Sequence, residues 1–181
     1  MALDVAALSA CTRCRLCETR QRVVIGTGPH DAKLLLVGEA PGRDEDEGGA
    51  PFIGRSGQLL FRLIDEEVGL SRAECYVTNT VKCRPPGNRV PARDELDACR
   101  PWLETQLGDL APRVTLALGL TAAREVLGAT LPMGRIHGRA RHLGDAAGLA
   151  TYHPAAALRD PALLDVMRAD LGVVRALLAS P

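Results

Sequence analysis

The stretch Leu34-Leu35-Leu36-Val37-Gly38-Glu39-Ala40-Pro41-Gly42 is an unbroken apolar run that ends in a turn containing glycine, proline and an acid. Such a run is typical of a strand that is buried on both faces of a parallel sheet. Ligands of open α/β sheets bind just beyond the carboxyl ends of the strands. Glu39 therefore lies where a catalytic acid is expected.

Further strand candidates follow along the chain, and helical patterns separate them. Strands are predicted at residues 33–38, 75–79, 114–119 and 149–153. This alternation predicts a three-layer α/β/α fold with a four-stranded parallel sheet. No repeat, low-complexity tract or long linker interrupts the pattern, so residues 1–181 are expected to form a single domain.

Two helices carry signals at particular residues. Thr121 is placed to cap a helix over residues 122–127. Pro101 lies inside an otherwise helical pattern over residues 94–107, so a break or kink is expected there.

The predicted strands end in Glu39, Asn79, Gly119 and His153. Because the carboxyl ends of parallel strands meet at one edge of a sheet, these residues are expected to share that edge. Strand-end polar residues also serve as caps and turns, but three informative ones at one edge favour a functional site.

The overall composition is that of an ordinary globular protein. The formal net charge is zero, so any footprint for nucleic acid must be local. No apolar run is long enough to cross a membrane, and the start lacks a signal-peptide pattern, so a cytoplasmic protein without a membrane partner is expected. One local basic segment contains Arg135, Arg139 and Arg141 with His137 and His142, and it would suit a phosphate backbone.

Six cysteines in such a chain predict metal or cluster ligands before disulfides. Cys11 and Cys14 form a C-x-x-C pair, and Cys83 and Cys99 follow as distant single residues. Four thiolates in this pattern can hold zinc or an iron–sulfur cluster. Cys17 could replace either member of the pair.

Four motifs then stand in a recognisable order: Gly38-Glu39-Ala40-Pro41-Gly42-Arg43-Asp44-Glu45-Asp46, Pro51-Phe52-Ile53-Gly54-Arg55-Ser56-Gly57-Gln58-Leu59-Leu60, Thr78-Asn79-Thr80-Val81-Lys82-Cys83-Arg84-Pro85-Pro86 with Asn88-Arg89, and His153-Pro154-Ala155-Ala156-Ala157-Leu158-Arg159-Asp160-Pro161. Together with the cysteines, they resemble the family 4 uracil-DNA glycosylases, the iron–sulfur class. The resemblance extends from Cys11 to the final helix.

This resemblance implies a four-stranded parallel sheet flanked by helices and a [4Fe–4S] cluster on Cys11, Cys14, Cys83 and Cys99. It implies that Cys17 is not a ligand. It also implies a glycosylase that releases uracil from DNA, single- or double-stranded, and leaves an abasic site. We expect the protein to act as a monomer.

The expected pocket needs a stacking ring, a group that reads the edge of the base and a donor for the leaving uracil. Phe52 is the expected ring, although a loop aromatic can also pack into the core. Asn79 offers the donor and acceptor that match uracil. His153 is expected to donate to O2 as negative charge grows there. Gly38 and Ala40 are expected to line the same pocket.

The acid that positions water or stabilises the sugar cation is expected to be Glu39, with Glu45 as the second choice. A better-known class of these enzymes has Asp at the position of Ala40, and alanine cannot replace it. Asp44, Asp46 and Glu47 are interpreted as a solvated acidic loop.

Several residues are expected to contact DNA. Ser56 and Gly57 precede a helix, where backbone N–H groups could bind a phosphate, but ordinary helix capping explains them equally well. Leu158 is expected to enter the space that the extruded base leaves. The remaining expected contacts come from the motifs and the basic segment: Asn88, Arg135, His137 and Arg159.

Two alternative functions remain open. The segment Arg135-Ile136-His137 resembles part of a loop in a related class that bonds covalently to uracil-DNA, in which case His137 would be the nucleophile. That class carries Gln at the position of Ala40, so hydrolysis is favoured. The other alternative is a non-catalytic, metal-stapled DNA-binding domain. Lys33 and Lys82 are the only lysines, and neither is an obvious nucleophile for strand cleavage.

Overall fold

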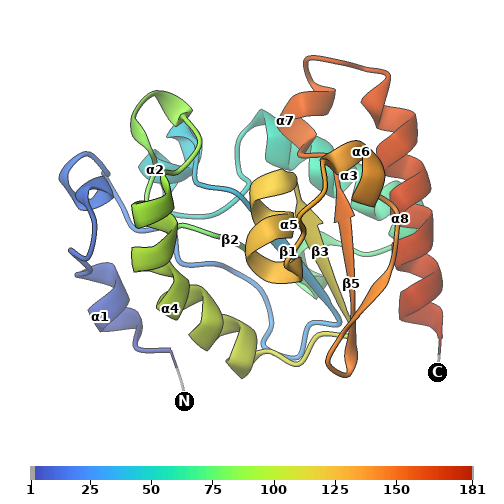
Figure 1. Cartoon of the computed structure of the whole chain (residues 1–181), viewed down its shortest axis with the longest axis horizontal. Helices are drawn as coiled ribbons and strands as arrows, with labels where there is room; N and C mark the ends of the chain where they lie inside the picture. Colours follow the sequence, from blue (N-terminus) through green and yellow to red (C-terminus); the bar gives the residue numbers. More distant parts are fainter. Residues whose placement is uncertain (1–2, 181) are drawn as a thin grey trace.

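A five-stranded sheet forms the centre of the computed structural model, which describes residues 3–180 (Figure 1). The strands are β1 (Leu34–Gly38), β2 (Cys75–Asn79), β3 (Val114–Leu118), β4 (Arg141–Leu143) and β5 (Ala146–Thr151). Their order in the sheet is β2-β1-β3-β5-β4. β2, β1, β3 and β5 run parallel, whereas β4 pairs antiparallel with β5.

Helices cover both faces of the sheet, which confirms the predicted α/β class and its three layers. One face packs against α3 (Arg55–Val68) and α8 (Leu163–Ala179). The other packs against α4 (Arg93–Asp109), α5 (Leu120–Leu127) and α6 (Met133–Ile136). In Figure 1, α8 stands at the right of the strands and α4 at the left. The remaining elements are short: α1 (Val5–Ser9), α2 (Arg43–Gly48), α7 (Pro154–Ala157) and the 3-10 helices η1 (Arg15–Glu18), η2 (Arg72–Glu74) and η3 (Pro86–Asn88).

The apolar run of β1 supplies both cores. Leu34 and Leu36 belong to the cluster beneath α3 and α8, and Leu35 and Val37 belong to the cluster beneath α4 and α5. All four side chains are fully buried. A strand with two buried faces needs an apolar residue at every position, which explains the unbroken run.

The prediction of a purely parallel, four-stranded sheet is wrong in one respect, because residues 141–143 add an antiparallel edge strand. Arg141 and His142 of β4 are exposed, so the strand carries no apolar pattern that could reveal it. The turn between β4 and β5 uses Gly144 at φ 62°, a conformation that favours glycine. β5 consequently begins earlier than predicted, at Ala146.

The helix signals were partly misleading. α4 continues from Arg93 to Asp109 with Pro101 inside it, so the helix is not broken there. Leu96 and Leu103 are buried on either side of the proline, and this packing outweighs the local preference. Thr121 lies inside α5, whose N-cap is Gly119, so the predicted cap is wrong.

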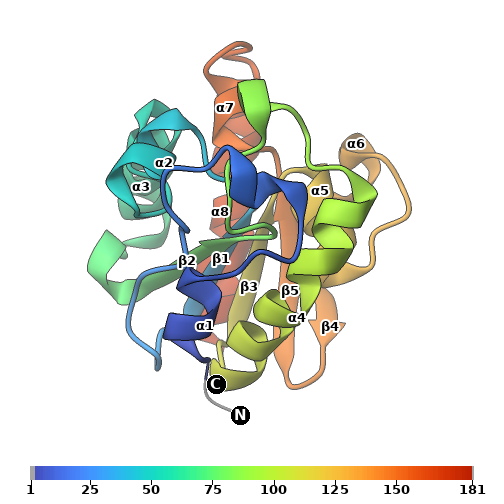
Figure 2. The ribbon, with the colours of Figure 1, turned by 90° about the vertical axis from the view of Figure 1, so that its left-hand side faces the viewer.

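The N-terminal segment crosses the front of β2 and lies beside α4 (Figure 2). Leu16 from this segment packs with Val81 and Leu96 in a third core cluster. Asp46, interpreted from the sequence as solvated, is 1% exposed, and its Oδ1 accepts from the backbone N–H groups of Gln21 and Arg22. The charge of Asp46 is therefore used to anchor the segment. No helix among residues 3–180 is long and apolar enough to span a membrane.

Candidate active site

A cavity of about 600 Å³ lies at the carboxyl ends of the parallel strands, the edge that the strand-end residues predicted. Most of the residues expected at the site line it: Glu39, Ala40, Glu45, Phe52, Ser56, Asn79, Asn88, His153 and Arg159. The other expected residues do not line it: Gly38, Gly57, Arg135, His137 and Leu158. The fold thus brings residues from four distant motifs to one cavity.

Asn79, the last residue of β2, presents an unused hydrogen-bond acceptor. Its side chain is buried, and its Oδ1 is the one buried side-chain polar atom without a partner among the residues that the structure describes. Leaving such an atom unpaired costs about 1–3 kcal/mol. Because Asn79 lines the cavity, an N–H group of a bound molecule can satisfy this oxygen. Lys82 Nζ donates to the Asn79 backbone carbonyl at 2.6 Å and holds the strand end in place.

His153 lines the cavity as the N-cap residue of α7. Its Nδ1 accepts from the Ala155 N–H at 3.1 Å, so the proton of the neutral ring is on Nε2. Burial, together with the positive charge of Arg159, lowers the pKa of His153 to about 4. The ring is therefore neutral near pH 7, with Nε2–H available as a donor.

This pKa predicts a pH-dependent stability. An unfolded histidine has a pKa of about 6.5. Between pH 6.5 and 4, His153 is therefore protonated in the unfolded chain but neutral in the folded chain. The free energy of unfolding should therefore fall as the pH is lowered through this window. Urea titrations at several pH values would measure the fall. A His153→Asn variant, which retains a cap but has no imidazole, should lose less stability over the same range, and an equal loss would contradict the prediction.

Glu39 follows β1 and lines the cavity with its carboxylate held from one side. Its Oε2 accepts from the Thr121 hydroxyl at 2.5 Å. Its backbone carbonyl accepts from the Thr80 hydroxyl at 2.6 Å. No described residue donates to Oε1, so this oxygen is available for water or a sugar. Thr121 had been expected to cap a helix, but its hydroxyl orients this carboxylate.

Glu45 also lines the cavity, but both of its oxygens are engaged. Oε1 accepts from the N–H groups of Ile53 and Gly54, and Oε2 accepts from that of Gly42, at 2.9–3.0 Å. Glu45 therefore joins the turn after β1 to the loop that carries Phe52. This arrangement favours a structural role for Glu45 and leaves Glu39 as the available acid.

Phe52 is held in a backbone conformation that a bulky residue rarely adopts, with φ at 53°. Arg72 of η2 donates to the Phe52 carbonyl at 2.9 Å and to the Pro51 carbonyl at 2.5 Å. The Phe52 ring lines the cavity, and its centre is 5.7 Å from that of the His153 ring. Such a conformation costs about 1–3 kcal/mol and persists only where its surroundings impose it. Here it places the aromatic side chain at the wall of the cavity.

Two glycines make room for Phe52, one for its ring and one for its backbone. A Cβ on Gly38 would lie 2.4 Å from Asn79 Oδ1 and 2.5 Å from the Phe52 ring, so Gly38 supports the site without lining it. A Cβ on Gly57 would lie 1.9 Å from the Phe52 carbonyl oxygen. The absence of a side chain at Gly57 therefore lets α3 pack against the loop that carries Phe52. This packing explains the glycine more simply than the expected contact with DNA.

Replacing Gly57 with Ala should strongly destabilise the fold. The new methyl group overlaps backbone atoms that cannot turn aside, so a loss of about 3 kcal/mol or more is expected in urea unfolding. Gly108→Ala is the matched control, because Gly108 is also helical and has open space around it. The control should gain about 0.5–1 kcal/mol from higher helix propensity. Equal effects of the two substitutions would contradict the packing role.

His137 and the basic segment lie outside the cavity lining. His137 Nδ1 is 3.1 Å from Oδ1 of the buried Asp170, which also accepts from the Thr151 hydroxyl at 2.6 Å. The ring centre of Tyr152 is 5.4 Å from that of His137, and Tyr152 lines the cavity instead. Arg135 and Leu158 are exposed, as surface contacts would be.

A second, small cavity of about 10 Å³ is lined by Cys11, Cys14, Cys83 and Cys99, whereas Cys17 does not line it. Burial raises the pKa of Cys83 to about 11 and also raises those of Cys14 and Cys99. Among residues 3–180, no three His, Cys, Asp or Glu side chains meet at a point suited to one metal ion. The four cysteine thiols instead line one shared small cavity.

Cationic and N–H groups face these thiols. Trp102 Nε1 is 3.3 Å from Cys11 Sγ, and Arg20 Nη1 is 3.4 Å from Cys83 Sγ. Arg13 and Lys82 also line the small cavity. Such donors would stabilise negatively charged sulfur, so the donor set fits an anionic iron–sulfur cluster.

Comparison with known proteins agrees with this geometry. Residues 25–172 match the model of the uracil DNA glycosylase superfamily. The chain belongs to this superfamily. It is 42% identical over 177 residues to the type-4 uracil-DNA glycosylase of Pyrobaculum aerophilum, covering 90% of this chain and 87% of the relative. It is 40% identical over 152 residues to the type-4 enzyme of Thermotoga maritima, covering 83% and 79%.

The type-5 uracil-DNA glycosylase of Thermus thermophilus is a more partial match, 38% identical over 120 residues, which are 59% of this chain and 54% of the relative. The type-4 relatives match most of their own length as well as most of this chain. The family expectation drawn from the four motifs is thus confirmed.

Several residues shape the site in this superfamily member in ways that were not predicted from the sequence. Thr121 orients Glu39, Arg72 holds the Phe52 loop, and Lys82 holds the end of β2. Lys82 is fully buried, with Nζ 2.8 Å from the Thr78 hydroxyl. Each acts on a residue distant in sequence or on a backbone atom, so only the folded chain reveals its partner.

Proposed function

We propose that this protein hydrolyses the N-glycosidic bond of deoxyuridine in DNA, releasing uracil and leaving an abasic site. The observation that carries the proposal is the buried, unpartnered Oδ1 of Asn79 at the cavity. Uracil presents N3–H beside the O4 acceptor, so one amide side chain can accept from the first and donate to the second. Cytosine presents an acceptor and an amino group in those places and is mismatched.

The extruded base would stack on Phe52 with its edge toward Asn79. As the bond between C1′ and N1 breaks, its electron pair passes to the base and negative charge grows on O2. The neutral His153 ring supports the role of donor to that oxygen through Nε2–H, because Nδ1 is occupied by Ala155. A donor that is already oriented needs no rearrangement as the charge develops.

The oxygen of a water molecule then bonds to C1′ of the oxocarbenium-like sugar, its extra proton passes to solvent, and the released uracil anion takes up a proton from solvent. Glu39 is the residue we assign to hold this water and to stabilise the cation. Thr121 fixes Oε2 of Glu39, and no described residue donates to Oε1. Glu45 is the weaker candidate because backbone amides occupy both of its oxygens.

We propose that Cys11, Cys14, Cys83 and Cys99 hold a [4Fe–4S] cluster that joins the N-terminal segment to the domain. The four thiols that share one small cavity, with N–H groups of Arg20 and Trp102 near their sulfurs, support this assignment. When bound, the cluster would supply a covalent cross-link between three segments of the chain. Purified protein should therefore be brown and contain iron, and a colourless protein containing zinc would refute the assignment.

Uracil-containing oligonucleotides, single- and double-stranded, test the proposed activity. Incubation should release free uracil, and strands should break only after alkali, because no lysine is placed to cleave the backbone. Lys82, one of the two lysines, is fully buried. Absence of free uracil from both substrates would refute the activity and favour a DNA-binding domain without catalysis.

The covalent alternative is weakened by the position of His137. Its ring is paired with Asp170 and does not line the cavity. Denaturing electrophoresis of the same reactions would distinguish the two functions, because a covalent product shifts the protein band. We expect no shifted band.

A further inference from the structure

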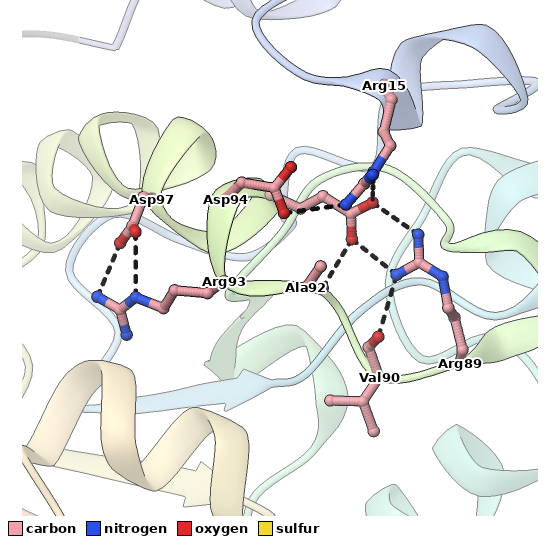
Figure 3. A network of polar contacts seen from close by, with 8 residues as sticks. Arg15, Arg89, Val90, Ala92, Arg93, Asp94 and Asp97 are labelled. Carbon is pink, nitrogen blue, oxygen red and sulfur yellow. Dashed lines mark hydrogen bonds and ion pairs between the residues drawn. The ribbon is translucent and has the colours of Figure 1, made fainter.

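Glu95, at the start of α4, is the centre of a buried ionic network that the proposed chemistry does not use. Its side chain is 0% exposed, and Glu95 itself does not line the large cavity. Oε1 accepts from Arg15 Nε at 2.9 Å and from Arg89 Nη2 at 2.6 Å. Oε2 accepts from Arg89 Nη1 and the Ala92 N–H, both at 2.8 Å. Figure 3 shows Arg15 and Arg89 reaching the network from separate segments.

The network joins the three segments that carry the cysteines. Arg15 directly follows Cys14, Arg89 lies in the loop that follows Cys83, and Glu95 lies one helical turn before Cys99. A buried carboxylate needs well-placed partners to offset its desolvation, so it holds them in a single arrangement. The hydrogen bonds from Arg89 lower the pKa of Glu95 to about 2, which keeps the carboxylate charged throughout the physiological range.

The loop that Arg89 holds is a wall of the large cavity. Asn88, Arg89 and Val90 all line it. Arg89 Nη1 also donates to the Val90 carbonyl at 3.1 Å. The ionic network therefore also holds the backbone of Val90. The Val90 side chain is 61% exposed. In Figure 1 this loop, in green, and α7 both rise at the edge toward which the β-strand arrows point.

We propose that Glu95 is a positioning residue for DNA binding, which, through Arg89, presents Val90 to the bases beside the extruded nucleotide. This inference rests on the proposed glycosylase function. An exposed apolar side chain beside the opening gains contact area when DNA covers it. When the target nucleotide is extruded, the adjacent base loses its stacking partner. Its exposed apolar face can then pack against the apolar side chain of Val90. The network fixes the loop before DNA arrives, so less ordering is required on binding.

The first test is a Val90→Ser variant with Val5→Ser as the matched control, since Val5 is 55% exposed and lies on α1, away from the cavity. The probe is DNA containing a 2′-fluorinated deoxyuridine, which resists cleavage, with 2-aminopurine as its neighbour. Val90→Ser should raise the dissociation constant about tenfold and change the 2-aminopurine fluorescence of the complex. Val5→Ser should change neither, and equal behaviour of the two variants would overturn the proposal.

The second test is Glu95→Gln, which keeps the shape of the side chain but removes its charge. It should raise the KM for uracil-DNA about tenfold while leaving kcat within about twofold, because Glu39, Asn79 and His153 lie on other elements. Hydrogen exchange should quicken at the amides of residues 87–90 and not in β1 or β3. Exchange that quickens everywhere, or a fall in kcat alone, would overturn the positioning role.

A double-mutant cycle decides whether Glu95 acts through Val90. In the Glu95→Gln background, Val90→Ser should add less than about twofold to the dissociation constant, whereas independent effects would multiply. Should Glu95→Gln fail to fold, Arg89→Lys replaces it in the cycle. Wild-type uracil release, measured in parallel, tests the proposed function separately, so activity with unchanged Val90→Ser binding would refute only this inference.

Discussion

Replacing Asn79 with Asp is expected to lower kcat/KM for uracil release by about a thousandfold. The wild-type Oδ1 is buried and has no partner among residues 3–180, so the site is prepared for a donor on the ligand. Aspartate has no N–H for O4, and its charge would lie next to that oxygen. Sites built to hydrogen-bond a substrate discriminate by about 10⁴–10⁵ when a partner is missing, and a smaller loss is expected here because aspartate can still accept from N3–H. Steady-state kinetics on a single-stranded uracil oligonucleotide would measure the change.

Asn88→Asp is the matched control for this substitution. Asn88 lines the same cavity, but it ends η3, which we expect to contact the DNA backbone, and its Oδ1 accepts from Arg84 Nε at 2.7 Å. The same chemical change there should raise KM by less than about tenfold, and lower salt should increase the penalty as added charge repels phosphate. A loss in Asn79→Asp that merely equals that in Asn88→Asp would refute base reading by Asn79.

Replacing His153 with Ala should lower kcat by about 100- to 1000-fold, the usual effect of removing one donor to a developing oxyanion. The ring is positioned before the substrate arrives, because Ala155 N–H occupies Nδ1 and leaves Nε2–H as the donor. A single-turnover experiment, with enzyme in excess over substrate, would show whether the chemical step itself is slowed.

Two further variants separate chemistry from structure at His153. His153→Asn retains a capping oxygen for α7 but cannot extend a donor as far, so it should melt near the wild type and remain inactive. His30→Ala removes an exposed histidine away from the cavity and should leave kcat unchanged. Recovery of kcat in His153→Asn would show that the cap, and not the imidazole, is what matters.

The regular part of the fold could be predicted because burial leaves a pattern in the sequence. β1, β2 and β3 are buried at every position, and each was predicted to within a residue or two from its apolar run. β4 was missed because an exposed edge strand has no such pattern. The effect of Pro101 on the helix was overestimated, because packing on both sides of the proline outweighs the local preference for a break.

The candidate site, too, could be predicted only in part from the sequence. Glu39, Asn79 and His153 end or follow strands, so their meeting at one cavity follows from the parallel order of the sheet. Gly57 was interpreted with equal weight as a phosphate contact or as part of an ordinary helix cap, whereas the structure shows that its lack of a side chain is needed for packing. Asp46 was interpreted as solvated because an acid in a charged run usually is, yet it anchors a distant backbone.

By itself, the sequence determined the layered α/β class, the edge of the sheet that carries the site and the family, because periodicity and motif order are local properties of a chain. Only the tertiary structure decided which acid is available. The sequence placed Glu39 before Glu45 from its position after β1, but the hydrogen bonds that distinguish them come from the fold: three backbone amides occupy Glu45, while Thr121 leaves one oxygen of Glu39 open. The same holds for Asn79, whose unpartnered oxygen becomes visible only when every neighbouring donor is in place. Hydrogen bonds between distant residues depend on where the chain folds back, and no local pattern records that.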